Sequence, residues 1–223
     1  SNRKNLDTME NLNKTYDVIV VGAGTGGTIA ARFAAQNGLR VCLLDRKPRK
    51  EIGNKICGDA VGNDIFDFLS INNPQGEELS CHIKGAKLYP PNREKCLTLI
   101  DPKQAGYVVN RVEFGQRLLN ESLDNGVDTF LDNTMALNLL YDNNRVTGIK
   151  VKLKNGEKKE LKSRLTIDAS GLYSRIRKSS KSSLIENNFE DKDAILCFRE
   201  IISFPSRDQD VMDPEYDLYP HAL

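Results

Sequence analysis

Residues 16–27 read Tyr-Asp-Val-Ile-Val-Val-Gly-Ala-Gly-Thr-Gly-Gly, and this stretch decides the fold class. The run Tyr16–Val21 is short, apolar and β-branched, which predicts a buried strand. Apolar residues recur with helical spacing over residues 28–37, and Gly38 is suited to end that helix. Arg40–Leu44 predicts the next strand. A strand, a short crossover helix and a second strand form a β-α-β unit, which implies a parallel strand pair.

Between the first strand and the helix lies a glycine-rich turn with the spacing G-x-G-x-x-G. Gly22 allows a sharp turn, Gly24 lets a pyrophosphate approach the backbone, and Gly27 lets helix and strand pack closely. Thr25 and Gly26 lie at the start of the helix, where unpaired backbone N–H groups present a partial positive charge to phosphates. Strand, turn and helix in this order predict a dinucleotide site.

An acidic residue ends the second predicted strand. Asp45 follows Gly27 by 18 residues, where a carboxylate can accept hydrogen bonds from the adenosine ribose. Arg46 and Lys47 come next, and two cations there would also suit a ribose 2′-phosphate. Because Asp45 would repel that phosphate, we favour the interpretation that Arg46 and Lys47 are solvated cations and bind no 2′-phosphate. Arg46 is still expected to lie beside the cofactor.

Composition excludes several other classes of protein. The formal charge is +1, so nucleic acid is not an expected partner. Five scattered cysteines without a Cys-x-x-Cys pair, and two histidines, predict neither a disulfide framework nor a metal site. No apolar run reaches the roughly 18 residues that span a bilayer. We therefore expect a cytoplasmic protein, and contact with a membrane surface stays open.

The rest of the chain predicts further helices and strands. The first such helix has Val61, Ile65, Phe68 and Leu69 on one face, and the second covers Val112–Asn125. An antiparallel meander is expected over residues 136–165, with turns at 142–144 and at Asn155-Gly156. The other expected strands are Ile83–Tyr89, Lys95–Ile100, Leu165–Ala169 and Ala194–Phe204.

A flexible segment and two domains are expected along the chain. Residues 1–15 are polar and predict a flexible segment. Residues 16–190 form the nucleotide-binding domain, with an insertion at about 72–108. Residues 191–223 begin a second domain.

Two later segments resemble FAD-binding enzymes of the p-hydroxybenzoate hydroxylase type. Arg111 opens a helix after a strand, as does an arginine near the flavin pyrophosphate in that family. Taken alone, Arg111 could also be a solvated residue at a helix start. Ile167–Arg177 resembles the segment in which a strand of the sheet ends beside the cofactor, which implies contacts from Asp168 and Gly171. The resemblance implies an α/β fold: a Rossmann-like FAD domain of the glutathione reductase/p-hydroxybenzoate hydroxylase type, with a β-meander and the start of a substrate-domain sheet.

Residues 55–60 read Lys-Ile-Cys-Gly-Asp-Ala. This segment is similar to the geranylgeranyl reductases, which often carry Cys-Gly-(Asp/Glu) here, with the cysteine near the flavin and the substrate cavity. The resemblance implies cofactor contacts from Cys57, Gly58, Asp59 and Ala60. It also makes Cys57 a candidate catalytic proton donor, unless its thiol only shapes the pocket. Cys42, within the second strand, is expected to be core packing.

The resemblance implies an FAD-dependent reductase of isoprenoid C=C bonds. Its partners would be an isoprenoid lipid substrate and an electron donor, either NAD(P)H or ferredoxin. Two alternatives remain: another flavoenzyme of this fold, such as an aromatic monooxygenase or a halogenase, and a non-catalytic nucleotide-binding fragment. Such enzymes run to roughly 350–450 residues, so we expect a C-terminal part to be absent from these 223 residues, and the activity of the chain alone is open.

Overall fold

The computed structural model describes residues 11–92, 94–100, 106–188, 190–193, 195–196 and 198–200. The described residues fall into two compact units. Unit 1 lies within Ser1–Asn54 and Gly115–Leu196, and unit 2 lies within Lys55–Phe114 and Cys197–Leu223. The glycine-rich turn belongs to unit 1, and the Cys-Gly-Asp segment belongs to unit 2.

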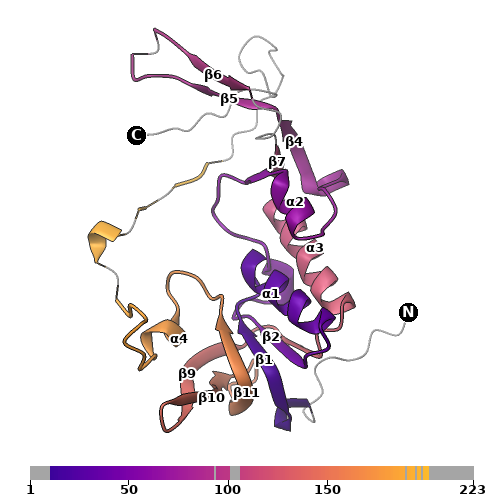
Figure 1. The fold of residues 1–223 in the computed structure, drawn as a ribbon, viewed down its shortest axis with the longest axis vertical. Coiled ribbons are helices and arrows are strands. Elements are labelled where there is room, and N and C mark those ends of the chain that lie inside the picture. The colour runs from indigo at the N-terminus through magenta and orange to yellow at the C-terminus, as the bar shows by residue number, and fades with distance from the viewer. Residues whose placement is uncertain are drawn as a thin grey trace. The chain divides into compact units, whose positions relative to one another are not determined.

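Unit 1 is built on one six-stranded sheet with the order β8-β2-β1-β11-β10-β9. The strands β8, β2, β1 and β11 are parallel neighbours, whereas β10 pairs antiparallel with β11 and with β9. Figure 1 shows this sheet with α1 beside it. The strands are β1 (Thr15–Val21), β2 (Val41–Leu44), β8 (Thr129–Leu131), β9 (Met135–Asp142), β10 (Arg145–Lys152) and β11 (Lys158–Asp168).

The helices of unit 1 begin and end close to the predicted positions. Helix α1 (Thr25–Gln36) starts three residues before the predicted helix, at the glycine-rich turn, and Gly38 has a left-handed φ of 77° beyond its end. Helix α3 (Arg111–Asp124) begins in unit 2 and continues in unit 1, and α4 (Arg175–Lys178) is a single turn. Three 3₁₀ turns are η1 (Asn11–Asn13), η2 (Arg49–Glu51) and η5 (Asp191–Asp193).

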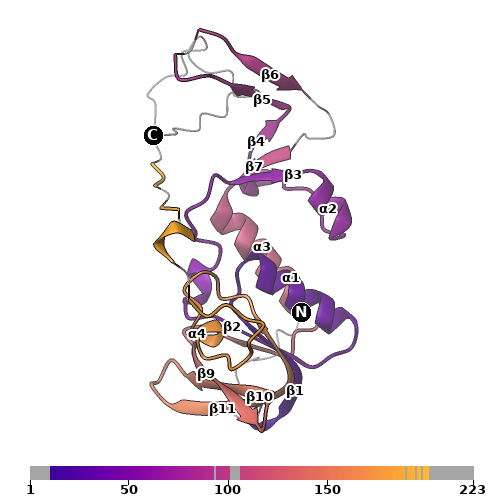
Figure 2. The ribbon, with the colours of Figure 1, turned by 60° about the vertical axis from the view of Figure 1, so that its left-hand side comes forward.

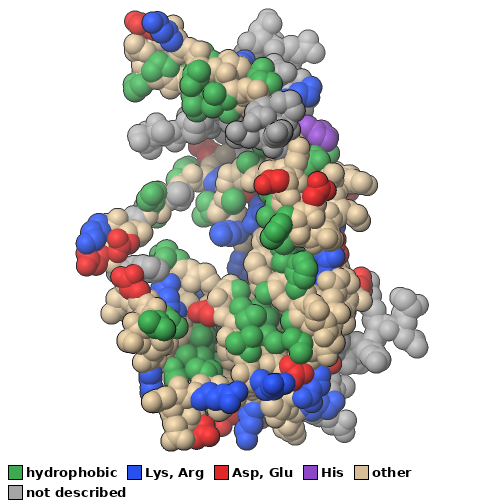
Figure 3. Space-filling view, viewed as in Figure 1, with side chains coloured by type: hydrophobic (Ala, Val, Ile, Leu, Met, Phe, Trp, Pro, Cys, Tyr) green, Lys and Arg blue, Asp and Glu red, His purple; other side chains and the backbone are tan. Residues whose placement is uncertain are grey.

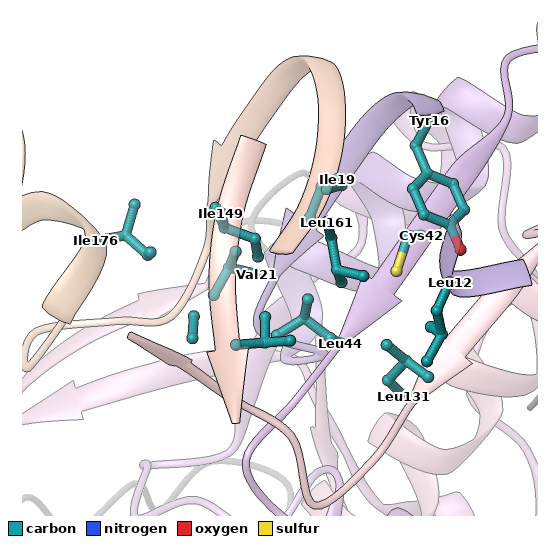
Figure 4. Close-up of a cluster of buried hydrophobic side chains, with 12 residues drawn as sticks. Leu12, Tyr16, Ile19, Val21, Cys42, Leu44, Leu131, Ile149, Leu161 and Ile176 are labelled. Atoms are coloured by element: carbon teal, nitrogen blue, oxygen red, sulfur yellow. The ribbon is translucent and has the colours of Figure 1, made fainter. Parts of the chain in front are cut away.

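The two faces of the sheet carry different hydrophobic clusters, because successive side chains of a strand point to opposite faces. Val18 and Val20 of β1 pack with residues of α1 and α3, including Ala31 and Leu119. The opposite cluster joins β1 and β2 to the meander (Figure 4). It contains Leu12, Tyr16, Ile19, Val21, Cys42, Leu44, Leu131, Ala136, Ile149, Val151, Leu161 and Ile176.

These observations confirm the predicted α/β class, the parallel β-α-β unit and the antiparallel meander. Ile149 and Val151 of the meander are buried, and Cys42 is part of the core, as predicted. The strand predicted to begin at Leu165 is instead the end of one longer strand, β11. The prediction of a flexible segment over residues 1–15 is wrong for residues 11–15, because Leu12 is buried in the core and β1 begins at Thr15. Residues 1–10 lie outside the described residues.

Unit 2 has a three-stranded antiparallel sheet with the order β3-β7-β4 and a separate hairpin of β5 and β6 (Figure 2). The core of this unit is centred on Phe66, whose ring lies 5.4 Å from that of Tyr107 and 6.1 Å from that of Phe114. Its elements are β3 (Ala60–Gly62), α2 (Asp64–Phe68), η3 (Gly76–Glu78), β4 (Leu79–Ile83), β5 (Gly85–Leu88), β6 (Leu97–Ile100) and β7 (Gly106–Val109).

The helix predicted around Val61, Ile65, Phe68 and Leu69 is partly wrong. Val61 lies in β3, where it pairs with Tyr107 of β7, and the helix is confined to α2. The buried side chain of α2 is Phe66, whereas Phe68 is 81% exposed. The pairing with a distant strand therefore overrides the local helical spacing.

The strands predicted at Ile83–Tyr89 and Lys95–Ile100 are partly confirmed. The first range spans the end of β4 and all of β5, and the second contains β6. All four residues of β6 are exposed, and Figure 3 shows hydrophobic side chains on the surface of this hairpin.

The strand predicted at Ala194–Phe204 is not present in the residues described there. Residues 195–196 and 198–200 belong to no helix or strand, and the remaining positions of the prediction lie outside the described residues. None of the described helices is both long enough and apolar enough to span a membrane.

Candidate functional site

Two glycines of the turn between β1 and α1 are required by the protein's own packing. Gly22 has a φ of 104°, and a Cβ there would clash with the carbonyl oxygen of Ala169. A Cβ on Gly27 would clash with the carbonyl oxygen of Gly22. Both glycines therefore allow the turn to lie tightly between α1 and the end of β11.

The other two glycines of the turn face open space. Gly24 and Gly26 are exposed, and an added Cβ on either would meet no atom of another described part of the chain within 4 Å. Gly24 is the N-cap of α1 with an ordinary extended backbone, and as a glycine it supplies no side-chain cap to the helix. Packing thus does not explain glycine at these positions. A turn without side chains at a helix N-terminus fits the diphosphate of a dinucleotide.

Asp45 holds the turn from the neighbouring strand. Its Oδ2 accepts a hydrogen bond from the backbone N–H of Ala23 at 2.7 Å, and its Oδ1 accepts one from that of Lys47 at 2.8 Å. A carboxylate has about four acceptor positions, so capacity remains for ribose hydroxyls. The ribose contact of Asp45 stays a prediction, and its bracing of the turn was not foreseen. Arg46 beside it is exposed.

Asp168 directs its carboxylate into its own loop. Its Oδ1 accepts hydrogen bonds from the N–H and the hydroxyl of Ser170 at 3.1 and 2.6 Å, and its Oδ2 accepts one from the Ser174 hydroxyl. The Ser174 oxygen in turn accepts from the backbone N–H of Arg177 and so caps α4. Gly171 has a φ of 84°, which explains glycine there. The loop after β11 is therefore tied to Asp168.

The same loop contacts the glycine-rich turn. The N–H of Ala169 donates to the carbonyl of Val21 at 2.8 Å, and the carbonyl of Ala169 lies against Gly22. The N–H of Gly22 donates to the carbonyl of Leu44 at 2.7 Å. Unit 1 thus brings together three sequence-predicted segments: the turn, Asp45 and the strand end at Asp168.

In unit 2, Arg111 begins α3 as predicted. The side chain of Asn110 accepts a hydrogen bond from the N–H of Val112 at 3.1 Å, which fixes where the helix begins. The Arg111 side chain is only 14% exposed, and its guanidinium lies 5.8 Å from the centre of the Phe114 ring. The alternative of a solvated arginine is therefore wrong.

Asp59 is the acidic partner of that arginine. It is 8% exposed, and its backbone has a left-handed φ of 63°. Its Oδ1 lies 4.0 Å from Nε of Arg111, and its Oδ2 lies 2.7 Å from a terminal guanidinium nitrogen of Arg199. Burial raises the pKa of the Asp59 carboxyl, and the charges of Arg199 and Arg111 oppose that rise. Sequence reasoning missed Arg199, because no local pattern marks a contact across 140 positions of the chain.

The other residues of the Cys-Gly-Asp segment are more accessible. Cys57 is partly buried and is in no disulfide, whereas Gly58 and Ala60 are exposed. A Cβ on Gly58 would meet no atom within 4 Å among the residues that the structure describes, so their packing does not require glycine there either. Unit 2 thus brings Asp59 and Arg111 together, with Cys57 two residues before Asp59.

An open glycine turn at a helix N-terminus, braced by an acid directly after the next strand, is typical of a dinucleotide-binding Rossmann-like fold. A family model described as FAD dependent oxidoreductase matches residues 17–172. The chain belongs to this family, and FAD is its cofactor.

Curated relatives of this chain are named for a particular reductase activity. The chain is 33% identical over 203 residues to the digeranylgeranylglycerophospholipid reductase of Sulfolobus acidocaldarius, which covers 90% of this chain and 43% of the relative. It is 31% identical over 204 residues to the enzyme of that name from Picrophilus torridus, with 89% of this chain and 49% of the relative covered. The resemblance to the geranylgeranyl reductases is thus confirmed, and the chain spans about half the length of these relatives.

Solved structures agree with this grouping. A geranylgeranyl bacteriochlorophyll reductase-like protein from Thermoplasma acidophilum has a TM-score of 0.70 and 29% identity, covering 76% of this chain and 43% of that one. The myxobacterial halogenase CndH has a TM-score of 0.62 and 23% identity, covering 74% of this chain and 39% of its own. The likeness to the halogenase shows the fold alone.

Proposed function

We propose that this chain is the FAD-binding part of a reductase that saturates isoprenoid C=C bonds in lipid precursors. The observation that carries this proposal is the 33% identity to a digeranylgeranylglycerophospholipid reductase over 90% of the chain. The Cys57-Gly58-Asp59 segment, typical of the geranylgeranyl reductases, supports the same substrate class. The electron donor would be NAD(P)H or ferredoxin.

Two groups of residues are proposed to contact FAD. The adenosine and diphosphate contacts, with the strand end near the cofactor, would come from Gly22, Gly24, Thr25, Gly26, Gly27, Asp45, Arg46, Asp168 and Gly171. The contacts on the flavin side would come from Cys57, Gly58, Asp59, Ala60 and Arg111.

The proposed reaction needs a proton as well as a hydride. FAD in its reduced form supplies the hydride when bound. An isolated alkene carries no carbonyl that could stabilise a carbanion, so protonation toward a tertiary cation is the easier route. Cys57 is a candidate donor, because its thiol is partly buried and in no disulfide.

The role of Cys57 can be tested with two substitutions. Cys57→Ala removes the proton and the sulfur, and Cys57→Ser keeps a hydroxyl of similar size. If Cys57 donates the proton, turnover of an isoprenoid lipid falls by roughly 10²–10⁴-fold in the alanine variant. Unchanged turnover in both variants would exclude the catalytic role.

Two measurements test the proposed function: the flavin absorption spectrum of the purified protein and the reoxidation of its reduced flavin by an isoprenoid lipid. Purified protein, as isolated or after incubation with FAD, should show the flavin absorption bands. Under anaerobic conditions the photoreduced protein should reoxidise when an isoprenoid lipid with C=C bonds is added, but not when its saturated counterpart is added.

Other outcomes would favour the alternatives. Reoxidation that needs oxygen and an aromatic substrate would identify a monooxygenase. Binding of FAD without any turnover would support a non-catalytic binding role. Protein that remains colourless after reconstitution would contradict the proposal.

A further inference from the structure

The backbone of Asp59 is tied to the strand that leads into α3. Its carbonyl accepts a hydrogen bond from the N–H of Val109 at 3.0 Å, at the end of β7. The next residue, Asn110, caps α3, and Arg111 is the first residue of that helix. The left-handed φ of 63° is unusual for a residue with a side chain, although aspartate tolerates it better than most residues. Asp59 and the start of α3 are therefore fixed relative to each other within unit 2.

The carboxylate of Asp59 lies between two arginines. Arg199 holds Oδ2 at 2.7 Å. Oδ1 faces Nε of Arg111 at 4.0 Å, and no donor among the described residues lies within hydrogen-bonding distance of it. At this separation the pair attracts by charge, with room to tighten into a direct bond. Such adjustment is common where a site closes around its ligand.

Glycine would satisfy the backbone at position 59 without any strain. Besides the strained backbone, an aspartate that is only 8% exposed costs free energy because its carboxylate is removed from water. Burial also raises the pKa of this group, which shows that its ionised form is disfavoured there. The attraction between the carboxylate and its two arginine partners offsets this cost. Of the two arginines, Arg111 is the one that begins a helix.

We propose that Asp59 is a positioning residue for Arg111, holding the guanidinium in the orientation in which it contacts the diphosphate and ribityl side of FAD. The guanidinium of Arg111 lies 5.8 Å from the centre of the Phe114 ring, within range of a cation–π interaction. The negative charge of Asp59 attracts the Nε side of the same guanidinium. The inference rests on the proposed role of Arg111 in FAD binding.

The test is a double-substitution cycle on the full chain. The variants are Asp59→Asn, Arg111→Gln and the two combined, with Asp67→Asn as a control that removes a carboxylate from an exposed position in the same unit. Asparagine keeps the shape of the side chain and tolerates the left-handed backbone. If Asp59→Asn does not fold, Asp59→Gly removes the carboxylate without backbone strain. The measurements are the dissociation constants of FAD and of AMP, and the urea midpoint without cofactor.

We expect Asp59→Asn to weaken FAD binding roughly tenfold and Arg111→Gln to weaken it at least as much, with little further loss in the double variant. AMP reaches only the adenosine side, so its affinity should stay within twofold in all variants. Asp67→Asn should match the unsubstituted protein.

Four results would overturn the inference. FAD affinity within twofold in Asp59→Asn, with a clear loss in Arg111→Gln, would reject positioning by Asp59 and leave the role of Arg111 intact. Additive losses in the double variant would mean that Asp59 acts independently. An unchanged FAD affinity in Arg111→Gln would reject the proposed role of Arg111, and the positioning role with it. Equal losses of FAD and AMP affinity with a lowered urea midpoint would show a general structural role instead.

Discussion

The four glycines of the turn between β1 and α1 meet two different requirements. Gly22 and Gly27 are buried between backbone atoms of the protein itself, so their lack of a side chain serves packing. Gly24 and Gly26 are exposed, and none of the described residues beyond their own surroundings in the chain occupies the space that a Cβ would take. The buried and the exposed glycines should therefore respond differently to the same substitution.

Alanine substitutions separate the two requirements. Gly27→Ala should lower stability by about 1–3 kcal/mol, because its methyl group meets the carbonyl of Gly22. Gly24→Ala should leave the urea midpoint unchanged, because its backbone is ordinary and its surroundings are open. It should nevertheless weaken FAD binding by about tenfold or more, since the methyl group occupies the diphosphate's approach. Fluorescence titration and urea unfolding measure both effects, and a Gly24→Ala protein with normal FAD affinity would contradict this account.

Tyr16 should make the protein sensitive to alkaline pH. Burial, with a contribution from the nearby Cys42 thiol, raises the pKa of the Tyr16 phenol to about 12, although its hydrogen bond to Thr129 lowers the pKa. Because the folded pKa exceeds the ordinary value of about 10, this contribution to stability is complete below pH 10 and is lost as the pH rises toward 12.

The comparison is the free energy of unfolding of the protein and of Tyr16→Phe at pH 8 and at pH 11.5. The unsubstituted protein should lose about 2 kcal/mol more than the variant over this interval. Absorbance at the tyrosinate band would follow the ionisation directly. Equal losses in both proteins would show that Tyr16 does not ionise during alkaline unfolding.

At the scale of helices and strands, local patterns predicted unit 1 better than unit 2. The strand, turn and helix at residues 16–37 and the meander follow from spacing and turn residues alone. Val61 was assigned to a helix because its spacing to Ile65 fits one, yet its backbone pairs with Tyr107. Leu12 stands in a polar stretch but is buried by residues from distant strands. Partners far along the chain decide such cases, and local periodicity does not contain them.

The capping of α4 offers a test at the same scale. The Ser174 hydroxyl donates to Asp168 and accepts from the N–H of Arg177, and the residue is only 3% exposed. Ser174→Ala should lower the free energy of unfolding by about 1–2 kcal/mol, as for a lost N-cap with a buried partner. Ser183→Ala, at an exposed position nearby, is the matched control. Equal unfolding midpoints for the two variants would contradict the role of Ser174.

For the whole molecule, the two units differ in how much of their chain is buried. Unit 1 has hydrophobic clusters on both faces of its sheet, whereas every residue of β6 in unit 2 is exposed. A two-stranded hairpin without a buried face is marginally stable in water. We expect amides of β5 and β6 to exchange with deuterium at least about a hundredfold faster than those of β1 and β2. Similar protection of both pairs, measured by mass spectrometry of peptides, would contradict this expectation.

The candidate site shows the same division between local and distant information. The glycine turn and Asp45 could be found because each stands next to a predicted strand or helix. The resemblance to known flavoenzymes added Arg111 and the strand end at Asp168. The ion pair of Asp59 with Arg199 could not be found, since two residues 140 positions apart share no local pattern.

The bracing of the turn by Asp45 limits how this nucleotide site could be re-engineered. In dinucleotide sites an acid at the end of the second strand hydrogen-bonds the ribose 2′-hydroxyl and disfavours an extra ribose phosphate, and Arg46 stands beside it here. Here the same carboxylate holds the N–H of Ala23 and that of Lys47. Exchanging Asp45 for a small neutral residue would remove a negative charge and release the loop in one step. A change of cofactor preference would therefore need a second substitution that ties the loop down again.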